Sequence, residues 1–391
     1  MSAASLVING VFDEAVVRTA AEQLRATCGG RAGAAFAFVS EDYLPELESF
    51  CDLVRVHGHV PSIFGSTAAG LVGAGREYEG ESGAALLFLD LPGATFFPMA
   101  FGREQTEPSM TPEAWHRRAG ARADEVKAWV VLANPLALGV DPWLDSWNKA
   151  WPGIPCVGGL ASSRLGPQGI QVFADGEVVR EGGLAIGIKG DFIMRTAISQ
   201  GCKPIGEPLT ITQAQDHVVL QLGLRSAYEV LNEVIGSMDE AERERAKGNI
   251  FAGLAMSEYH DDFQAGDFLV RNIVAADPAS GAVVVGAWPR VGQTLQYQMR
   301  EKDTAQSDYH RMLDELQRLG TPMASLVFTC TGRGSRFFGE PGHDARMLAH
   351  ALGAHPSAGL FCNGEIGPVA GRTFAHGYSA TLALFYPQKD S

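Results

Sequence analysis

The residues best suited to chemistry lie near the C-terminal end of the chain. Residues 362–368 read Cys-Asn-Gly-Glu-Ile-Gly-Pro, so one turn carries a thiol, an amide and a carboxylate between glycines that allow close approach. Glu365 could pair with an amino group, while Asn363 and backbone N–H groups would orient a small polar ligand. A structural interpretation competes with this one, because Asn363 tolerates a left-handed conformation and Glu365 could bind nearby backbone N–H groups.

A second turn, Cys330-Thr331-Gly332-Arg333-Gly334, follows an apolar run, with Arg336 close behind. Arg333 and Arg336 could hold a carboxylate or phosphate through paired hydrogen bonds. The turn lacks the GxxxxGK[ST] pattern, so nucleotide binding is not indicated. An Arg333–Glu365 pair would suit an amino acid zwitterion. The structural alternative is that Arg333 simply pairs with a carboxylate such as Glu365 or Glu340.

The cysteines and histidines leave catalysis open as an alternative. Cys330 or Cys362 could act as a nucleophile with His376 or His343 as its base. Buried, inert thiols are commoner, and neither a triad nor an oxyanion hole is recognisable, so a non-enzymatic function is favoured. His376 is expected either to orient the Glu365 turn or to line the pocket.

No metal site and no cofactor are expected. His57 and His59 would share one face of a strand, and His343 and His350 would lie two turns apart on a helix. Neither pair has a third potential ligand at a spacing that is typical of a zinc site.

The elements that position these residues follow a shared pattern, in which an apolar strand stops in a glycine-rich polar turn. The pattern occurs at Ile63–Gly70, Pro155–Ser163 and Leu360–Gly367. It predicts an α/β or α+β fold with mixed sheets flanked by helices and an internal strand-helix-strand-hairpin repeat, two units in each half. Ligands bind at the carboxyl ends of strands in open α/β sheets, which is where these turns lie.

Length and composition predict two related domains, residues 1–222 and 223–391. The net charge of -14 argues against binding to nucleic acid or to an anionic membrane surface. The six cysteines are scattered, and the N-terminus lacks the features of a signal peptide, so a cytoplasmic location is expected.

The chain resembles the FIST family of proposed sensory domains. The resemblance is carried by Leu360–Pro368 with His376–Thr381, by Cys330–Gly334, and more loosely by Val157–Ser162 and Gln200–Gly206. The first turn departs from the family pattern, since Ser66 and Leu71 stand where a Cys and an acidic residue are common.

This resemblance implies a FIST N-type domain followed by a FIST C-type domain. It implies a signal-transduction protein that binds a small ligand such as an amino acid, and with the composition above it predicts a cytoplasmic sensor of a small polar metabolite. From the chemistry of the two turns, the expected ligand-binding residues are Cys330, Arg333, Arg336, Cys362, Asn363, Glu365 and His376. A separate signalling protein could be its partner. A cysteine-dependent enzyme and a protein-interaction scaffold remain the alternatives.

Overall fold

The computed structural model describes residues 2–102, 110–259, 262–264 and 266–388. The chain divides into two compact units, of which unit 1 comprises Met1–Ile198, His310–Ala375 and Ser379–Ser391, and unit 2 comprises Ser199–Tyr309 and His376–Tyr378. Mixed sheets with flanking helices make up the fold, which confirms the predicted fold class.

Within the described residues, unit 1 is built from three repeats whose elements follow the same order, except that the third has an additional short helix and that the end of its first strand and the start of its first helix are grouped with unit 2. The first repeat consists of β1 (Ser2–Asn9), α1 (Glu14–Thr27), β2 (Ala34–Val39), α2 (Leu47–Gly58), β3 (Ile63–Thr67), β4 (Gly70–Gly73), β5 (Arg76–Glu79) and β6 (Gly83–Asp90). The second consists of β7 (Thr95–Phe101), α3 (Pro112–Ala119), β8 (Ala128–Ala133), α4 (Val140–Ala150), β9 (Cys156–Leu160), β10 (Val172–Ala174), β11 (Glu177–Val178) and β12 (Gly183–Lys189).

The third repeat is interrupted by unit 2 after its first strand. It consists of β13 (Phe192–Gln200), α7 (Lys302–Gln317), β22 (Ala324–Cys330), α8 (Ser335–Phe338), α9 (His343–Leu352), β23 (Ser357–Cys362), β24 (Glu365–Val369), β25 (Arg372–His376) and β26 (Ser379–Pro387). The sequence pattern predicted two such units in each half. The structure instead has two units before the interruption and one around it, because much of the second half forms a barrel.

Each repeat contributes its hairpin to the sheet of another repeat. The strand orders are β1-β6-β2-β3-β10-β11, β25-β24-β9-β8-β12-β7 and β13-β26-β22-β23-β4-β5. In each sheet the two strands joined by a helix run parallel, as β22 and β23 do, and the last strand of the repeat pairs antiparallel with the first of them. The exchange closes the three sheets into a cyclic arrangement around one interior.

Three glycines occupy equivalent positions in the parallel pairs. A Cβ on Gly65, Gly158 or Gly359 would lie 2.0, 1.8 or 2.0 Å from a carbonyl oxygen of the neighbouring strand. Only glycine permits this approach, so the repeat leaves a signature in the sequence at the third residue of β3, β9 and β23.

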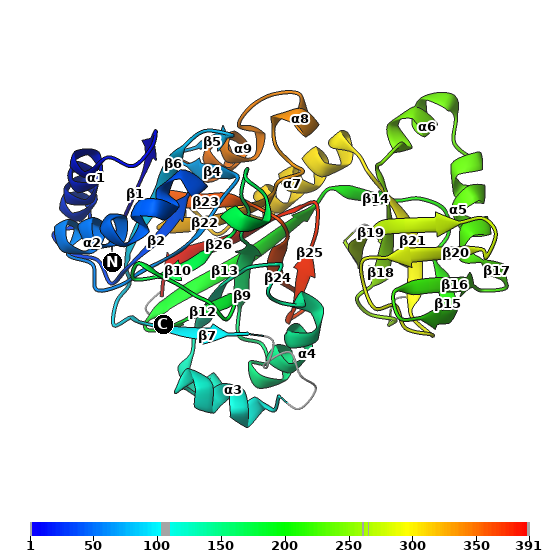
Figure 1. Cartoon of the computed structure of the whole chain (residues 1–391), viewed down its shortest axis with the longest axis horizontal. Coiled ribbons are helices and arrows are strands. Elements are labelled where there is room, and N and C mark those ends of the chain that lie inside the picture. Colours follow the sequence, from blue (N-terminus) through cyan, green and yellow to red (C-terminus); the bar gives the residue numbers. More distant parts are fainter. Residues whose placement is uncertain (1, 103–109, 260–261, 265, 389–391) are drawn as a thin grey trace. The chain divides into compact units, whose positions relative to one another are not determined.

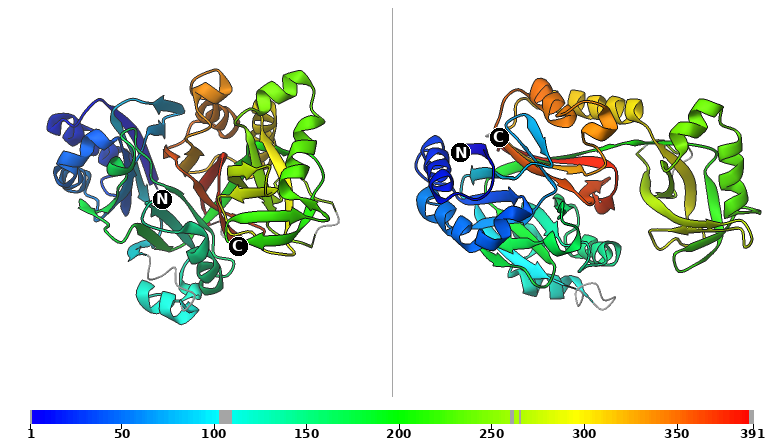
Figure 2. Two further views of the ribbon diagram at one scale, coloured as in Figure 1. Left: turned by 45° about the vertical axis from the view of Figure 1, so that its right-hand side comes forward. Right: turned by 45° about the horizontal axis from the view of Figure 1, so that its top comes forward.

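The inner faces of the three sheets form one apolar core that includes Phe36, Phe64, Val130, Phe328 and Leu360. The outer faces are covered by helices: α1 and α2 cover the first sheet, α3 and α4 the second, and α7 and α9 the third, as Figures 1 and 2 show. The helices therefore seal the outer face of each sheet and leave the ends of the strands to form turns.

The described part of unit 2 forms a barrel that carries the helices α5 (Ala227–Gly236) and α6 (Glu240–Ala246). Its strand order is β14-β21-β15-β16-β20-β19-β18, and the barrel closes because β18 also pairs with β21. The strands are β14 (Cys202–Pro204), β15 (Leu209–Gln215), β16 (Val218–Leu222), β17 (Arg225–Ser226), β18 (Ile250–Ala255), β19 (Phe268–Asp277), β20 (Ala282–Val285) and β21 (Thr294–Arg300).

The strand predicted around His57 and His59 is wrong. His57 lies in the last turn of α2, and His59 caps that helix in a left-handed conformation with φ 52°. Each imidazole contacts a side chain of α1 instead: His57 contacts Glu22 and His59 contacts Arg25. Among the described residues no cluster of His, Cys, Asp or Glu side chains is arranged to hold a metal ion.

Candidate functional site

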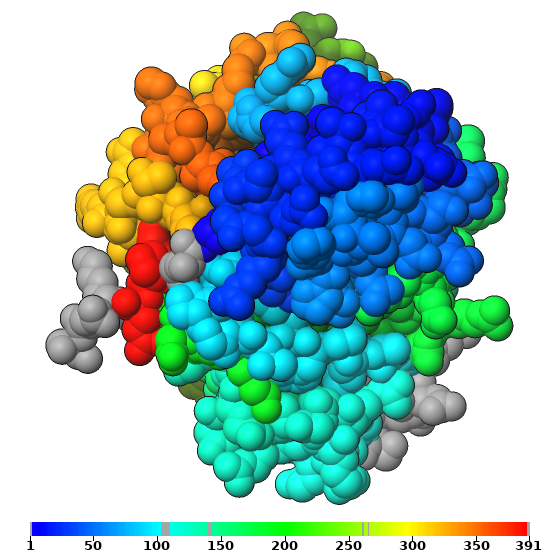
Figure 3. Space-filling model, turned by 90° about the vertical axis from the view of Figure 1, so that its left-hand side faces the viewer, coloured from blue at the N-terminus to red at the C-terminus, as the bar shows by residue number. Residues whose placement is uncertain are grey.

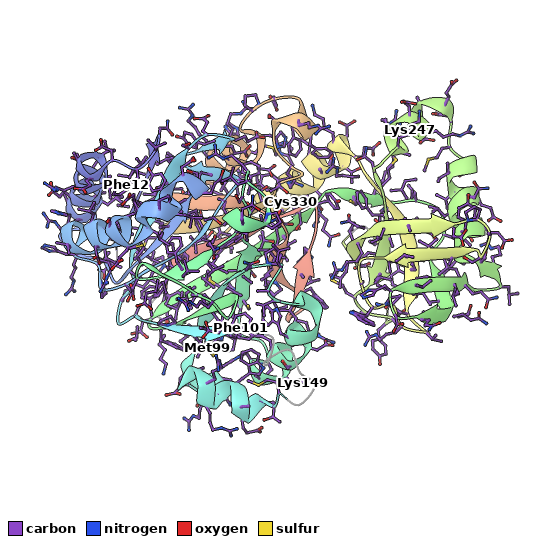
Figure 4. The ribbon with its side chains drawn as sticks, in the orientation of Figure 1. Phe12, Met99, Phe101, Lys149, Lys247 and Cys330 are labelled. Atoms are coloured by element: carbon purple, nitrogen blue, oxygen red, sulfur yellow. The ribbon has the colours of Figure 1, made fainter. Side chains whose placement is uncertain are left out.

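The candidate site lies in unit 1 at the carboxyl ends of β22 and β23. Cys330 and Cys362 are the last residues of these strands and are direct register partners (Figure 4 labels Cys330). Arg333 lies in the turn after β22, Glu365 is the first residue of β24 just after the turn that follows β23, and both of these side chains are buried. The topology thus brings together four of the predicted residues.

The three turns that follow β3, β9 and β23 are hydrogen-bonded to one another. Ser162 lies at their junction, since its hydroxyl donates to Phe361 O and accepts from Ala69 N. Asn363 continues the contact, because its backbone N–H donates to Leu160 O at 3.0 Å and its side-chain amide donates to Ala161 O at 2.9 Å. The predicted repeat of glycine-rich turns therefore converges in space.

Arg333 is held by Asp344, a carboxylate that was not among the partners expected for it. Its Nε and Nη2 atoms donate to the two carboxylate oxygens of Asp344 at 2.7 and 3.0 Å, and both side chains are buried. Burial by itself would raise the pKa of Asp344, but the Arg333 charge and the His343 hydrogen bond lower it to about 2. The Nε–Nη2 edge of the guanidinium is therefore occupied by Asp344 and cannot also bind a ligand carboxylate.

Aromatic contacts fix the position of this ion pair. The Phe338 ring stacks on His343, with centroids 3.6 Å apart and 7° between the planes, and the Arg333 guanidinium lies 5.2 Å from the same ring centroid. Thr329 on β22 donates a further hydrogen bond to Asp344. Arg333 is thus fixed by β22, α8 and α9 together.

The strand β5 anchors the two helices that follow β22. Glu77 accepts a hydrogen bond from Ala345 N in the first turn of α9, and Glu79 accepts hydrogen bonds from Ser335 N and Oγ at the start of α8. Burial raises the pKa of Glu77 to about 7, and the nearby Asp344 charge adds to the rise. The hairpin contributed by the first repeat therefore helps to hold the site.

Glu365 is fully buried, and only one of its two carboxylate oxygens accepts hydrogen bonds from the described residues. Its Oε2 accepts hydrogen bonds from Ser379 N at 3.2 Å and Ser379 Oγ at 2.7 Å, whereas its Oε1 accepts none from the described residues. Burial raises its pKa to about 8, against the opposing effects of Ser379, the Arg333 charge and the Cys330 thiol. At neutral pH the carboxyl group is therefore mostly protonated.

The environment of Cys362 disfavours a thiolate. Burial raises its pKa well above the ordinary value, and Glu365 and Cys330 add to that rise. The Cys362 sulfur also packs against Gly159, where a Cβ would lie 2.4 Å from it. A nucleophilic cysteine needs the opposite surroundings.

The remaining predicted residues lie around this cluster. Asn363 is exposed on the turn after β23, and Arg336 is exposed on α8. His376 is the last residue of β25 and is buried, and it is grouped with unit 2.

Three residues of the site were not predicted from the sequence: Asp344 holds Arg333, Ser379 holds Glu365, and Ser162 joins the three turns. Asp344 could have been suspected as an acidic residue in the first turn of a predicted helix close to Arg333. The two serines lie in segments that carry the family resemblance, but their roles were not predictable because their hydrogen-bond partners are distant in sequence.

No helix in the described residues is both long enough and apolar enough to cross a bilayer.

Curated relatives match this chain over most of its length. An uncharacterized protein of Mycobacterium tuberculosis strain H37Rv is 31% identical over 373 residues, which is 95% of this chain and 96% of the relative. An uncharacterized protein of Mycobacterium bovis is 31% identical over 329 residues, which is 83% of each chain.

Two solved structures of cyanuric acid hydrolases, one of them from A. caulinodans, align with 9% and 10% identity. The first alignment covers 100% of this chain and 99% of the other, and the second covers 99% and 100%. Their TM-scores of 0.35 and 0.32 are too low to support an inference about function.

The family models give the clearest assignment. The model for the FIST N domain matches residues 33–225, and the model for the FIST C domain matches residues 227–368. Together they span both halves of the chain, including the turns that carry Cys330, Arg333, Cys362 and Glu365. The chain therefore belongs to the FIST family, as its motifs predicted.

Proposed function

We propose that the chain is a small-molecule sensor whose ligand, an amino acid or a related amine, binds at Glu365. The observation that carries this proposal is the buried Oε1 atom of Glu365, which makes no hydrogen bond to the described residues. A buried polar atom without a partner is costly, and a ligand ammonium group would supply the missing donor. The exposed Asn363 would contact the rest of the ligand from the adjoining turn.

The buried Arg333–Asp344 pair changes the role expected for Arg333. Because Asp344 occupies one edge of the guanidinium, Arg333 would act mainly through its charge, which favours the ionised form of Glu365. Arg336, exposed on α8, would then be the better candidate to meet a ligand carboxylate.

A sensor must couple binding to a change of structure. Since Glu365 has no exposed surface, a ligand would reach it only when the turns that cover it separate. Binding would then select an opened arrangement, and the differential affinity for the two arrangements is what would signal to a partner protein. The enzyme alternative is less favoured because the Cys362 thiol is not activated.

A thermal-shift screen of the common amino acids and their decarboxylated amines tests the proposal. A binder should stabilise the protein by about 2–3 kcal/mol at roughly 100 times its Kd. Glu365→Gln should abolish the shift, whereas Glu340→Gln, which alters an exposed carboxylate of the same region, should leave it unchanged. A shift that survives in Glu365→Gln would refute the site, and a shift lost in Cys362→Ser together with measurable turnover would favour the enzyme.

A further inference from the structure

A cavity of about 440 Å³ opens in unit 1 away from Glu365. Its walls come from β1, α1, the β4–β5 turn, α9 and the segment 353–357. Figure 3 shows this face of the molecule, with α1 in dark blue, the β4–β5 hairpin in light blue and α9 in orange on the same side. Its volume falls within the range of about 300–1,000 Å³ that is typical of small-molecule sites.

The lining of the cavity carries no charge. Within the described part of the chain, none of its lining residues is Asp, Glu, Lys or Arg. Its apolar surface comes from side chains such as Leu6, Leu24, Val72 and Leu348, while small residues such as Ala349 leave the space open. A charged ligand would lose its hydration here without gaining an ionic partner.

The polar side chains of the lining are largely occupied by the protein itself. His355 uses both ring nitrogens, with Nδ1 2.8 Å from Gly353 O and Nε2 2.9 Å from Ser325 Oγ, and burial lowers its pKa. Ser5 Oγ accepts from Ser357 N, and Thr27 Oγ1 donates to Gln23 O. Recognition in this cavity would therefore rest on apolar contact.

From these observations we propose that the cavity is a second binding site, which takes a neutral and mainly apolar small molecule. Gln23, exposed on α1 at the edge of the cavity, is the lining side chain best placed to bind a single polar end group. Leu348 and Ala349 belong to α9, the helix whose first turn presents Asp344 to Arg333. A molecule bound here would contact the same helix that fixes the Glu365 site.

The test uses three probes of equal chain length: 1-octanol, octanoate and octylammonium. Their dissociation constants are measured at pH 7 by ligand-observed NMR with the full chain. Octanol should bind at least tenfold more tightly than either ion. No binding of octanol up to its solubility limit, or binding of either ion as tight as that of octanol, would overturn the proposal.

Variants locate the bound probe. Ala349→Phe places a ring in the cavity and should weaken octanol binding at least tenfold, whereas His350→Phe, at the exposed neighbouring position of α9, should change it less than twofold. If Ala349→Phe does not fold, Gln23→Phe at the exposed rim serves the same purpose. Octanol binding that is unchanged in the folded cavity variant would place the probe elsewhere and refute the site. Glu365 does not line this cavity, so the octylammonium measurement is repeated in Glu365→Gln, which removes the proposed amine site and leaves the cavity intact.

Discussion

At the scale of single residues, the protonation of Glu365 controls the chemistry of the site. A neutral carboxyl group is stable in its buried position, while its ionised form is favoured mainly by Ser379 and the charge of Arg333. The group would therefore bind an amine only by giving up its proton, which makes both stability and binding depend on pH.

Replacing Glu365 by Gln should remove a specific part of the pH dependence of stability. The native pKa of about 8 lies above the usual value of 4.5, so the folded chain keeps a proton that the unfolded chain loses. The wild type should therefore lose stability as pH rises from 4.5 to 8, by up to about 1.4 kcal/mol per pH unit. Urea unfolding of both proteins across this range measures the difference, to which Glu77 contributes equally in both. Parallel curves would show that Glu365 titrates normally.

Breaking the Arg333–Asp344 ion pair should strongly destabilise the fold. Asp344→Asn leaves a buried guanidinium without its counter-charge and should cost about 3–5 kcal/mol of unfolding free energy. The control is Glu340→Gln, which removes the exposed ion pair with Arg346 on the same helix and should cost less than about 1 kcal/mol. Equal effects in denaturant titrations would mean that the buried pair does not hold α9 in place.

At the scale of elements, the site depends on the close approach of the parallel strands β22 and β23, because the residues of the site follow the ends of these two strands. Gly359→Ala would place a Cβ 2.0 Å from Val327 O and should destabilise the fold by about 1–3 kcal/mol or more. Gly236→Ala offers a matched control at the end of α5, where a Cβ meets nothing within 4 Å, and it should be neutral or stabilising. The melting temperatures of both variants are measured by calorimetry. An unchanged melting temperature in Gly359→Ala would contradict the strand register.

Some of these elements were predictable from the sequence, and others were not. The strand-then-turn pattern identified the turns that bear Cys330 and Glu365, because alternation and glycine are local signals. The exchange of hairpins such as β4–β5 between sheets has no local signal, so the anchoring of α8 and α9 by Glu79 and Glu77 was not predictable. The pairing of Arg333 with Asp344 was missed for a different reason, since several carboxylates near Arg333 in the sequence were chemically equivalent as partners.

At the scale of the whole molecule, the three repeats of unit 1 meet through Ser162. Ser162→Ala removes its hydrogen bonds to Phe361 O and from Ala69 N and should lower the stability of unit 1 by about 1–3 kcal/mol. Tryptophan fluorescence reports mainly on this unit, because Trp115, Trp129, Trp143, Trp147 and Trp151 lie in it while Trp288 lies in unit 2. An unchanged fluorescence transition would show that the junction contributes little.

The release of a proton on binding tests the central claim most directly. The heat of binding of an amino acid or amine that shifts the melting temperature is measured at pH 7 in two buffers of different ionisation enthalpy. If Glu365 receives the ammonium group, close to one proton per ligand should be released, and affinity should rise up to about tenfold per pH unit below pH 8. Binding without proton release, or with the same release in Glu365→Gln, would contradict the account.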